Sequence, residues 1–208
     1  MTSAPDSAIS KQSLHEFLAA IASKTPTPGG GAAAGAVAAI AAALARMVVN
    51  YSVGKKTLAP HEPLLRESLD ALDRGSALLL KLADEDAAAY GLVNELSRLP
   101  ETDARRQQEW PAAVRAGMDV PLAMIAACVD LLRRFESLCG TTNPHLRSDL
   151  AIAAVLAEAG ARSARWNVLV NAPNIPEPAR AADLANADRM REEAARLATS
   201  IESRCGHV

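Results

Sequence analysis

The stretch that decides the fold is residues 65–97, LRESLDALDRGSALLLKLADEDAAAYGLVNELS. Along it, apolar positions recur at alternating intervals of four and three residues, which is the spacing of one face of an α-helix. Pro100 follows the stretch and cannot continue a helix. The sequence therefore predicts one unbroken helix of about 33 residues. Its inward stripe consists of Leu65, Leu69, Leu72, Ser76, Leu79, Ala83, Asp86, Tyr90, Val93 and Ser97.

The composition of the whole chain agrees with a helical fold. Of the 208 residues, 50% are hydrophobic but only 3% are aromatic, and Ala and Leu supply 45 and 25 residues. Ala and Leu favour helices, whereas β-branched and aromatic residues favour strands. This composition argues against a β sandwich or barrel. We expect an all-α, single-domain bundle of six to seven helices, whose small side chains let the backbones approach closely.

Prolines and glycines divide the rest of the chain into shorter helical segments. A break or kink is expected at Pro121, because a proline inside a helix removes a hydrogen bond and its ring clashes with the preceding turn. Residues 1–8 are expected to form a disordered tail, and no linker or repeat divides residues 1–208. Further helices are expected at residues 9–23, 32–53, 102–117, 122–139, 146–171 and 179–204. One face of 32–53 carries Val37, Ile40, Leu44, Met47 and Tyr51.

Charge, cysteine usage and apolar runs exclude several classes of protein. The formal net charge is −2, so the chain has no basic footprint for nucleic acid. Cys128, Cys139 and Cys205 form no CxxC pair, and the four histidines lack metal-ligand spacing. The first residues have no apolar region of a signal peptide. Residues 29–45 are apolar but mostly Ala and Gly, too weakly apolar for a membrane span. We expect a soluble, cytoplasmic protein that binds no metal.

Two aspartates lie on stripes that are otherwise apolar. Asp86 falls between Ala83 and Tyr90 on the inward face of the long helix. A buried carboxylate without a partner costs several kcal/mol, so the fold must give it a partner or a use, unless the helix drifts off register and leaves it at a rim. Asp149 shares a face with Ile152 and also lies in the first turn of its helix, where the helix dipole favours a carboxylate. Both aspartates are candidate functional residues.

Three further features are candidates for ligand binding. The loop Pro28-Gly29-Gly30-Gly31 precedes a helix, whose free N–H groups can bind an anion. Three glycines exceed what a helix start requires, and they fit a ligand or a neighbouring helix close to the backbone. Asn167 and Asn171 share a helix face, where they can bind a heterocycle or finish the helix end. Lys55 and Lys56 form either a functional pair or an ordinary solvated one.

Several short motifs follow one another from about Ser13 to Asn171, namely TPTPGGG at 25–31, MVVNYSVGKK at 47–56, DAAAY at 86–90, VPL at 120–122, SDL at 148–150 and NVLVN at 167–171. In the order and spacing of these motifs, the chain resembles the cyclodeaminase/cyclohydrolase family of folate enzymes. That family includes the cyclodeaminase half of formiminotransferase-cyclodeaminase and small stand-alone bacterial proteins. The sequence departs from the family at Ala32, where serine is usual, and after Lys56, where an aromatic residue is common.

The resemblance implies an all-helical homodimer that binds tetrahydrofolate derivatives. A stand-alone chain of this length is most similar to bacterial methenyltetrahydrofolate cyclohydrolase, which converts 5,10-methenyltetrahydrofolate and water to 10-formyltetrahydrofolate. Cyclodeamination of 5-formimidoyltetrahydrofolate, which releases ammonia, acts on the same one-carbon centre and stays an alternative. A non-catalytic helical scaffold is a second alternative, although a scaffold requires neither the inward aspartate nor the glycine loop. The reaction requires no metal or redox cofactor.

The same resemblance suggests a role for each candidate residue. The methenyl carbon lies in a cationic amidinium, so a buried carboxylate is expected as the base, and Asp86 and Asp149 compete for this role. Lys55 or Lys56 holds the glutamate tail or delivers a proton. The glycine loop supports the pterin or the tail, and two amides bond the pterin edge. We expect one cavity, floored by Gly29, Gly30 and Gly31, on which Lys55, Lys56, Asp86, Asp149, Asn167 and Asn171 converge, and we expect Pro28 to contribute to substrate binding.

Overall fold

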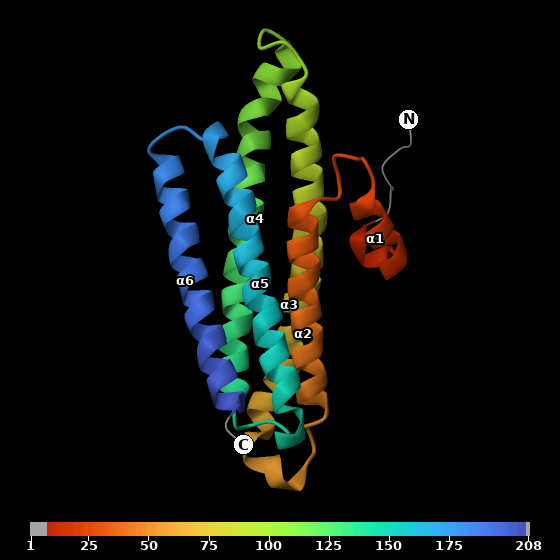
Figure 1. The fold of residues 1–208 in the computed structure, drawn as a ribbon, viewed down its shortest axis with the longest axis vertical. Coiled ribbons are helices and arrows are strands. Elements are labelled where there is room, and N and C mark those ends of the chain that lie inside the picture. The colour runs from red at the N-terminus through yellow and green to blue at the C-terminus, as the bar shows by residue number, and fades with distance from the viewer. Residues whose placement is uncertain (1–7, 207–208) are drawn as a thin grey trace.

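Every regular element that the structure describes is helical, as the sequence predicts (Figure 1). The computed structural model describes residues 8–206, so the predicted tail at 1–8 lies outside this range except for its last residue. The α-helices of the described range are α1 (Leu14–Ala22), α2 (Gly30–Asn50), α3 (Glu62–Ser97), α4 (Ala104–Leu138), α5 (Arg147–Asn171) and α6 (Ala179–Gly206). Short 3-10 helices lie at Ile9–Lys11, Lys56–His61, Pro144–Leu146 and Ala172–Asn174.

The long helix α3 is unbroken, and it begins three residues earlier than expected. The predicted inward stripe is buried or partly buried as far as Ala83. Further along, Ala89 and Leu96 are buried in place of Tyr90 and Ser97. The reason is that a stripe repeating every 3.5 residues drifts around a helix with 3.6 residues per turn.

The expected break at Pro121 is wrong. α4 continues without interruption from Ala104 to Leu138, although it contains both Pro111 and Pro121. Each proline removes one backbone hydrogen bond. Buried apolar residues nevertheless occur on both sides of Pro121, which is itself buried. Packing along the whole helix therefore outweighs the local cost of each proline.

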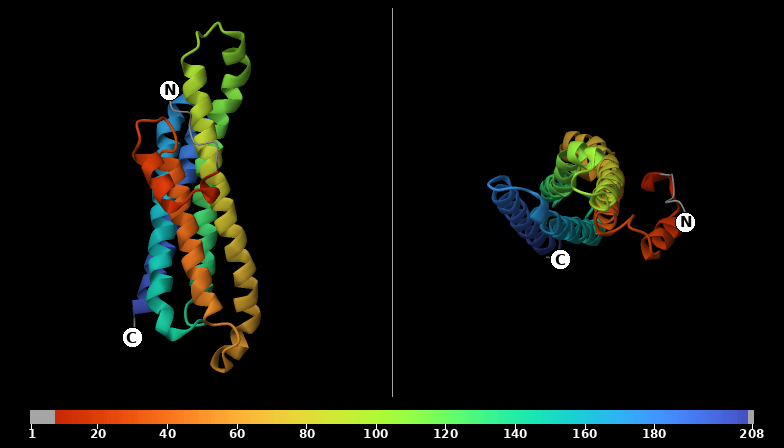
Figure 2. Two further views of the ribbon diagram at one scale, coloured as in Figure 1. Left: turned by 90° about the vertical axis from the view of Figure 1, so that its right-hand side faces the viewer. Right: turned by 90° about the horizontal axis from the view of Figure 1, so that it is seen from above.

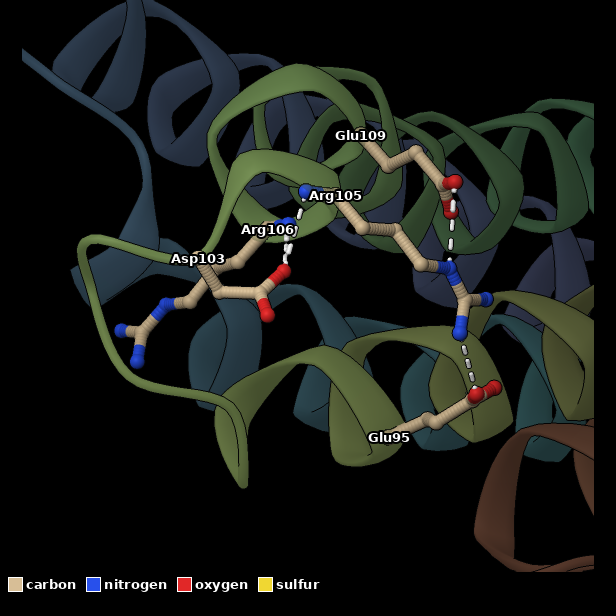
Figure 3. A network of polar contacts seen from close by, with 5 residues as sticks. All are labelled: Glu95, Asp103, Arg105, Arg106 and Glu109. Atoms are coloured by element: carbon tan, nitrogen blue, oxygen red, sulfur yellow. Dashed lines mark hydrogen bonds and ion pairs between the residues drawn. The ribbon is translucent and has the colours of Figure 1, made fainter.

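The tip of the α3–α4 hairpin is held by a network of charged side chains (Figure 3). Asp103 caps α4, because its Oδ1 accepts hydrogen bonds from the backbone N–H groups of Arg105 at 2.9 Å and Arg106 at 3.1 Å. The Arg105 guanidinium donates to Glu95 of α3 at 2.6 Å and to Glu109 of α4 at 3.1 Å. Exposed ion pairs each contribute at most about 1 kcal/mol, and of these contacts the one between Arg105 and Glu95 is the one that joins the two helices.

Close packing in the core depends on small side chains, as the alanine content predicts. α2 packs between α3 and α5, and its inward face consists mostly of Ala and Gly. A Cβ on Gly35 would lie 2.8 Å from the Cβ of Ala83 in α3, and a Cβ on Gly160 in α5 would lie 2.9 Å from the Cβ of Ala38. Glycine therefore sets the helix spacing at both interfaces. α6 packs on the other side of the bundle, against α4 and α5 (Figure 2).

The short helix α1 stands apart from the bundle (Figure 2). The backbone N–H of Ile9, just before it, donates to Asp84 Oδ1 of α3 at 2.7 Å. Phe17 is the buried residue of α1, whereas Leu14 and Leu18 are exposed. The apolar side of α1 therefore covers the bundle only in part.

Two helices, α2 and α4, are long and apolar enough to cross a membrane. In α2, 56% of the most apolar window is buried inside the bundle, and in α4 the share is 44%. The burial of more than half of the α2 window agrees with the interpretation of residues 29–45 as a buried helix.

Candidate functional site

One cavity joins polar residues from four helices. Its volume is about 240 Å³, and it lies where the start of α2, the second half of α3, the middle of α4 and the end of α5 meet. Six of the predicted site residues line it, namely Gly29, Gly30, Gly31, Asp86, Asn167 and Asn171. Its other walls are Pro26, Thr27, Ala87, Tyr90, Val93, Gly117 and Val170.

Asp86 lies against the first turn of α2. A Cβ built on Gly31 would be 2.1 Å from Asp86 Oδ2 and 2.2 Å from Asp86 Cγ, so any side chain at position 31 would displace the carboxyl group. A Cβ on Gly30 would lie 3.6 Å from Asn167 Oδ1, which is an ordinary contact. Of these two glycines, Gly31 is therefore the one that the position of Asp86 requires.

Burial raises the pKa of Asp86 from 3.8 to about 6. Removal of a carboxylate from water disfavours its charged form. No Lys, Arg or His lies among the lining residues to offset this effect. A carboxyl group that titrates near neutral pH is suited to exchange protons with a substrate.

The start of α2 presents backbone donors at the cavity. Gly29 is the N-cap residue, and no side chain accepts a hydrogen bond from the N–H groups of the first turn. Free N–H groups at a helix N-terminus bind anions and other hydrogen-bond acceptors. Pro28 precedes Gly29 and is joined to Thr27 by a cis peptide bond. Pro28 belongs to the loop but not to the cavity wall.

The two asparagines of α5 have different surroundings. Asn171 Nδ2 donates to the backbone oxygen of Gly117 in α4 at 2.6 Å, which ties α5 to α4. Asn167 Nδ2 is buried and has no hydrogen-bond partner within residues 8–206. Because an unpaired buried donor costs about 1–3 kcal/mol, this amide fits a ligand that supplies an acceptor. Asn167 is therefore the stronger candidate for ligand recognition, and Asn171 holds the wall.

Lys55, Lys56 and Asp149 lie at the opposite end of the bundle. α2 leads away from the cavity and α5 returns to it (Figure 1), so the cavity is separated from the end of α2 and the start of α5 by about 32 Å. The expected convergence of these three residues with Asp86 is therefore wrong within one chain. Motifs that follow one another along the sequence lie at alternate ends of an antiparallel bundle.

The surroundings of these three residues differ. Lys55 and Lys56 are exposed, and neither has an ion-pair partner in the part of the chain that the structure describes. Asp149 lies in the first turn of α5, where the helix dipole stabilises a carboxylate. This placement matches the helix-start explanation, which leaves Asp86 as the aspartate of the cavity.

Tyr90 and Gly117 are two of the seven lining residues that the sequence does not predict as site residues. Tyr90 lies one helical turn after Asp86. Its place on the same predicted stripe is the feature of the sequence that could have identified it as a site residue. Nothing in the sequence indicates that Gly117 lines the cavity, because the predicted helix ends there, whereas the observed helix α4 continues past it. Aromatic or apolar residues next to an inward carboxylate on the same helix face indicate the cavity wall better than the predicted helix ends do.

The lining residues supply acid–base chemistry and hydrogen bonding. Asp86 is the carboxylate of the wall, and Tyr90 is the other ionisable lining residue. Within residues 8–206, no group of three or more His, Cys, Asp or Glu side chains is placed to hold a metal ion. A carboxyl group beside free N–H groups and an unpaired amide suits a polar heterocycle that undergoes proton transfer.

Comparison with known proteins decides the family. The sequence pattern described as formiminotransferase-cyclodeaminase matches residues 13–190, which is most of the chain. The chain belongs to the formiminotransferase-cyclodeaminase family. The resemblance inferred from the short motifs is thereby confirmed.

The relatives of this chain within the formiminotransferase-cyclodeaminase family are named after two different activities. The methenyltetrahydrofolate cyclohydrolase of Methylorubrum extorquens is 34% identical over 172 residues, which are 81% of this chain and 83% of that protein. The formimidoyltransferase-cyclodeaminase of Mus musculus is 30% identical over 173 residues, but these are 32% of that protein. The chain thus spans about a third of the length of its mammalian relatives.

A solved structure shows the same fold. The crystal structure of formiminotetrahydrofolate cyclodeaminase from Thermotoga maritima matches this chain with a TM-score of 0.87 and 28% sequence identity. The match covers 95% of this chain and 98% of the other. The helical bundle of this family member is therefore shared over nearly its whole length.

Proposed function

We propose that this family member is a methenyltetrahydrofolate cyclohydrolase, which hydrolyses 5,10-methenyltetrahydrofolate to 10-formyltetrahydrofolate. The observation that carries the proposal is the unpaired carboxyl group of Asp86 in the wall of the cavity. The reacting carbon of the substrate lies in a cationic amidinium shared by N5 and N10. A carboxylate shielded from water attracts such a cation more strongly than one in bulk solvent. The Methylorubrum extorquens relative of similar length carries this name.

Asp86 acts as the base in the first step. With its carboxyl group ionised, Asp86 removes a proton from a water molecule while the water oxygen bonds to the methenyl carbon. The product is a neutral hydroxy adduct, in which the carbon is still bonded to N5 and N10. A positioned base of this kind typically accelerates a reaction by about 10²–10⁴-fold.

Asp86 then acts as the acid. The protonated carboxyl group gives its proton to N5 as the bond between the carbon and N5 breaks. The hydroxyl proton leaves to solvent as the carbonyl of the formyl group forms, so one proton is released for each substrate consumed. A pKa of about 6 suits both steps near neutral pH, because the carboxyl group can accept and return a proton.

Binding of the pterin is assigned to neutral donors. Asn167 Nδ2 provides an unused buried donor, and the first turn of α2 provides free N–H groups. Both can bond the oxygen and nitrogen acceptors of a pterin ring. Gly31 lets Asp86 approach α2 closely, so the carboxyl group and the N–H groups face the same ligand.

The proposal includes a cytoplasmic homodimer. A cavity of about 240 Å³ is smaller than the roughly 300–1,000 Å³ of most ligand pockets, so part of a folate must lie outside it. A second subunit is well suited to cover that part. The three cysteines are free and buried, which agrees with a reducing compartment.

Cyclodeamination is the second candidate reaction. The Thermotoga maritima relative is named a formiminotetrahydrofolate cyclodeaminase. In that reaction N10 would attack the formimidoyl carbon and ammonia would leave, so the same cavity and carboxyl group would serve. The choice therefore depends on the substrate that the cavity accepts.

An assay with both substrates tests the proposal. Purified protein is given 5,10-methenyltetrahydrofolate or 5-formimidoyltetrahydrofolate, and loss of the methenyl absorbance and release of ammonia are followed against a buffer blank. We expect catalysed loss of the methenyl absorbance, with a kcat/KM that rises with pH through about 6 because Asp86 must be ionised. Ammonia release without methenyl hydrolysis would establish the cyclodeaminase instead, and inactivity on both would support the non-catalytic scaffold.

A further inference from the structure

One backbone carbonyl in the cavity wall lacks its usual partner within the helix. In an α-helix, the carbonyl oxygen of each residue accepts a hydrogen bond from the N–H group four residues later. For Gly117 of α4 that later residue is Pro121, and a proline has no N–H group. Gly117 and Pro121 are both buried, and a buried carbonyl oxygen without a partner destabilises the fold. The fold must therefore supply a donor from elsewhere.

The side chain of Asn171 supplies this donor. α4 and α5 pack against each other, and Asn171 Nδ2 of α5 donates to the Gly117 oxygen at 2.6 Å. A carbonyl oxygen can only accept a hydrogen bond, so the carboxamide must turn its nitrogen toward Gly117. If the carboxamide turned over, two oxygens would face each other and the Gly117 carbonyl would lose its partner. Pro121 therefore fixes which end of the Asn171 carboxamide faces α4.

The carboxamide held in this way presents an acceptor to a ligand. Asn171 lines the cavity, and among residues 8–206 its Oδ1 accepts no hydrogen bond. An unrestrained asparagine offers a ligand either a donor or an acceptor, because its carboxamide can rotate by half a turn. At position 171 the nitrogen is held against α4, so the oxygen on the other side of the carboxamide is left for the ligand. This part of the wall selects a ligand that donates a hydrogen bond.

Asn171 lies away from the reacting group of the cavity. Asp86 contacts the first turn of α2, because a Cβ on Gly31 would overlap its carboxyl group. Asn171 instead contacts α4, where a Cβ on Gly117 would lie 3.6 Å from its Nδ2. A substrate that puts its one-carbon unit at Asp86 therefore extends its opposite edge toward Asn171. In a pterin ring that edge carries the 2-amino group, which is a hydrogen-bond donor.

We propose that Pro121 and Asn171 together determine which group the cavity accepts at position 2 of the pterin ring. Pro121 leaves the Gly117 carbonyl without a helical partner, this carbonyl orients the Asn171 carboxamide, and Asn171 Oδ1 accepts a hydrogen bond from the 2-amino group. Pro121 acts through Asn171 and is a positioning residue. That the donor is a pterin 2-amino group rests on the proposed function, whereas the orientation of the carboxamide rests only on its hydrogen bond and on the chemistry of proline.

An analogue with an oxo group in place of the 2-amino group reports this orientation. Its oxygen would face Asn171 Oδ1, and two acceptors at hydrogen-bond distance repel each other. The carboxamide cannot turn to meet the analogue without leaving the Gly117 carbonyl unpaired. In Pro121→Ala a new backbone N–H group bonds this carbonyl, so the carboxamide can turn and donate Nδ2 to the oxo group. The substitution therefore predicts a gain in binding of the analogue, which a loss of packing would not produce.

Calorimetric titration of two ligands under nitrogen tests the proposal without any assay of activity. The ligands are tetrahydrofolate and 2-deamino-2-oxotetrahydrofolate, which have the same tail. We expect the natural protein to bind tetrahydrofolate about 10²-fold more tightly than the oxo ligand, and Pro121→Ala to lower this ratio to about tenfold through tighter binding of the oxo ligand. Pro111→Ala is the matched control, because Pro111 is an exposed proline of the same helix outside the cavity wall. Its ratio should equal that of the natural protein.

A second variant keeps the test decisive if Pro121→Ala does not fold. Asn171→Ala removes the carboxamide, so the two ligands should then bind with nearly equal affinity. The proposal is overturned if the natural protein binds both ligands equally or binds neither, if either site variant keeps the natural ratio, or if Pro111→Ala lowers the ratio as much as Pro121→Ala. Discrimination as expected without methenyl hydrolysis would refute the proposed function alone, and hydrolysis without discrimination would refute this inference alone.

Discussion

The end of the bundle that holds Asp86, called here the cavity end, and the opposite end that holds Lys55 and Lys56, called the lysine end, treat their charges in opposite ways. At the cavity end, Asp86 is withdrawn from water, receives no neighbouring cation and has a raised pKa. At the lysine end, Lys55 and Lys56 are exposed to solvent, so their charges carry no free-energy penalty of burial. Natural folds accept an unfavourable burial of charge mainly at functional sites. The difference therefore points to Asp86 as the reacting group and to the lysines as a binding element.

The largest expected effect is on the rate of the Asp86→Asn variant. Asparagine keeps the shape of the side chain but can neither accept a proton from water nor balance the cation. We expect kcat for methenyl hydrolysis to fall by about 10²-fold or more, with unchanged helix content by circular dichroism. Asp149→Asn, at the lysine end, is the matched control and should lose less than about tenfold. An unchanged kcat for Asp86→Asn would remove this residue from the mechanism.

The next effect concerns the glycine that Asp86 contacts. A Cβ in Gly31→Ala would lie 2.1 Å from Asp86 Oδ2, so the carboxyl group must move. Misplacement of a catalytic group by about 1 Å can cost about 10²-fold in rate, and we expect a loss of this order in kcat. Gly91→Ala in α3 is the control, because its Cβ would meet nothing within 4 Å. Equal activity in the two alanine variants would show that Asp86 is not held in a required position.

A smaller effect is expected at the lysine end. If Lys56 only grips the glutamate tail, Lys56→Ala should raise KM by about tenfold and leave kcat nearly unchanged, because uniform binding is lost. Lys81→Ala, an exposed lysine of α3 paired with Glu85, should change neither constant. Steady-state kinetics at low ionic strength would detect the difference. A fall in kcat for Lys56→Ala would instead show that Lys56 delivers a proton.

The smallest expected effect is a pH-dependent gain in the thermal stability of the Asp86→Asn variant. The pKa of Asp86 is raised from 3.8 to about 6 on folding, so the folded state binds this proton more tightly than the unfolded state does. Its contribution to stability is complete below pH 3.8 and is lost as the pH rises through about 6, by at most about 3 kcal/mol. Asp86→Asn should therefore melt at a higher temperature than the natural protein at pH 7.5. At pH 4 the two Tm values should coincide, and a difference that does not change with pH would contradict the burial of Asp86.

Much of the fold follows from the sequence, because long periodic stripes specify helices strongly. The stripe from Leu65 to Ser97 predicted α3, and the alanine content predicted the close helix packing. The continuity of α4 through Pro121 could not be predicted, because it depends on packing against other helices. The sequence indicates only the local free-energy cost of a proline inside a helix. The packing that offsets this cost is seen only in the assembled bundle.

The candidate site was predictable only in part. Asp86 is a candidate because a carboxylate interrupts an apolar stripe, and the structure places it in the wall of one cavity together with Gly29–Gly31 and Asn167. Lys55, Lys56 and Asp149 were expected beside them, but within one chain they lie at the other end of the bundle. Spacing along a sequence does not tell which end of an antiparallel bundle a residue occupies. It also does not show whether a second copy of the chain brings the two ends together.

The pH dependence of catalysis tests most directly whether Asp86 is the base. The kcat/KM for methenyl hydrolysis is measured from below to above pH 6 with the natural protein and with Asp86→Asn, each corrected for the uncatalysed rate. We predict that kcat/KM of the natural protein rises with pH through about 6, because Asp86 must be ionised, and that the residual activity of Asp86→Asn lacks this rise. An equal rise in both proteins would contradict the account, because a group other than Asp86 would then be titrating.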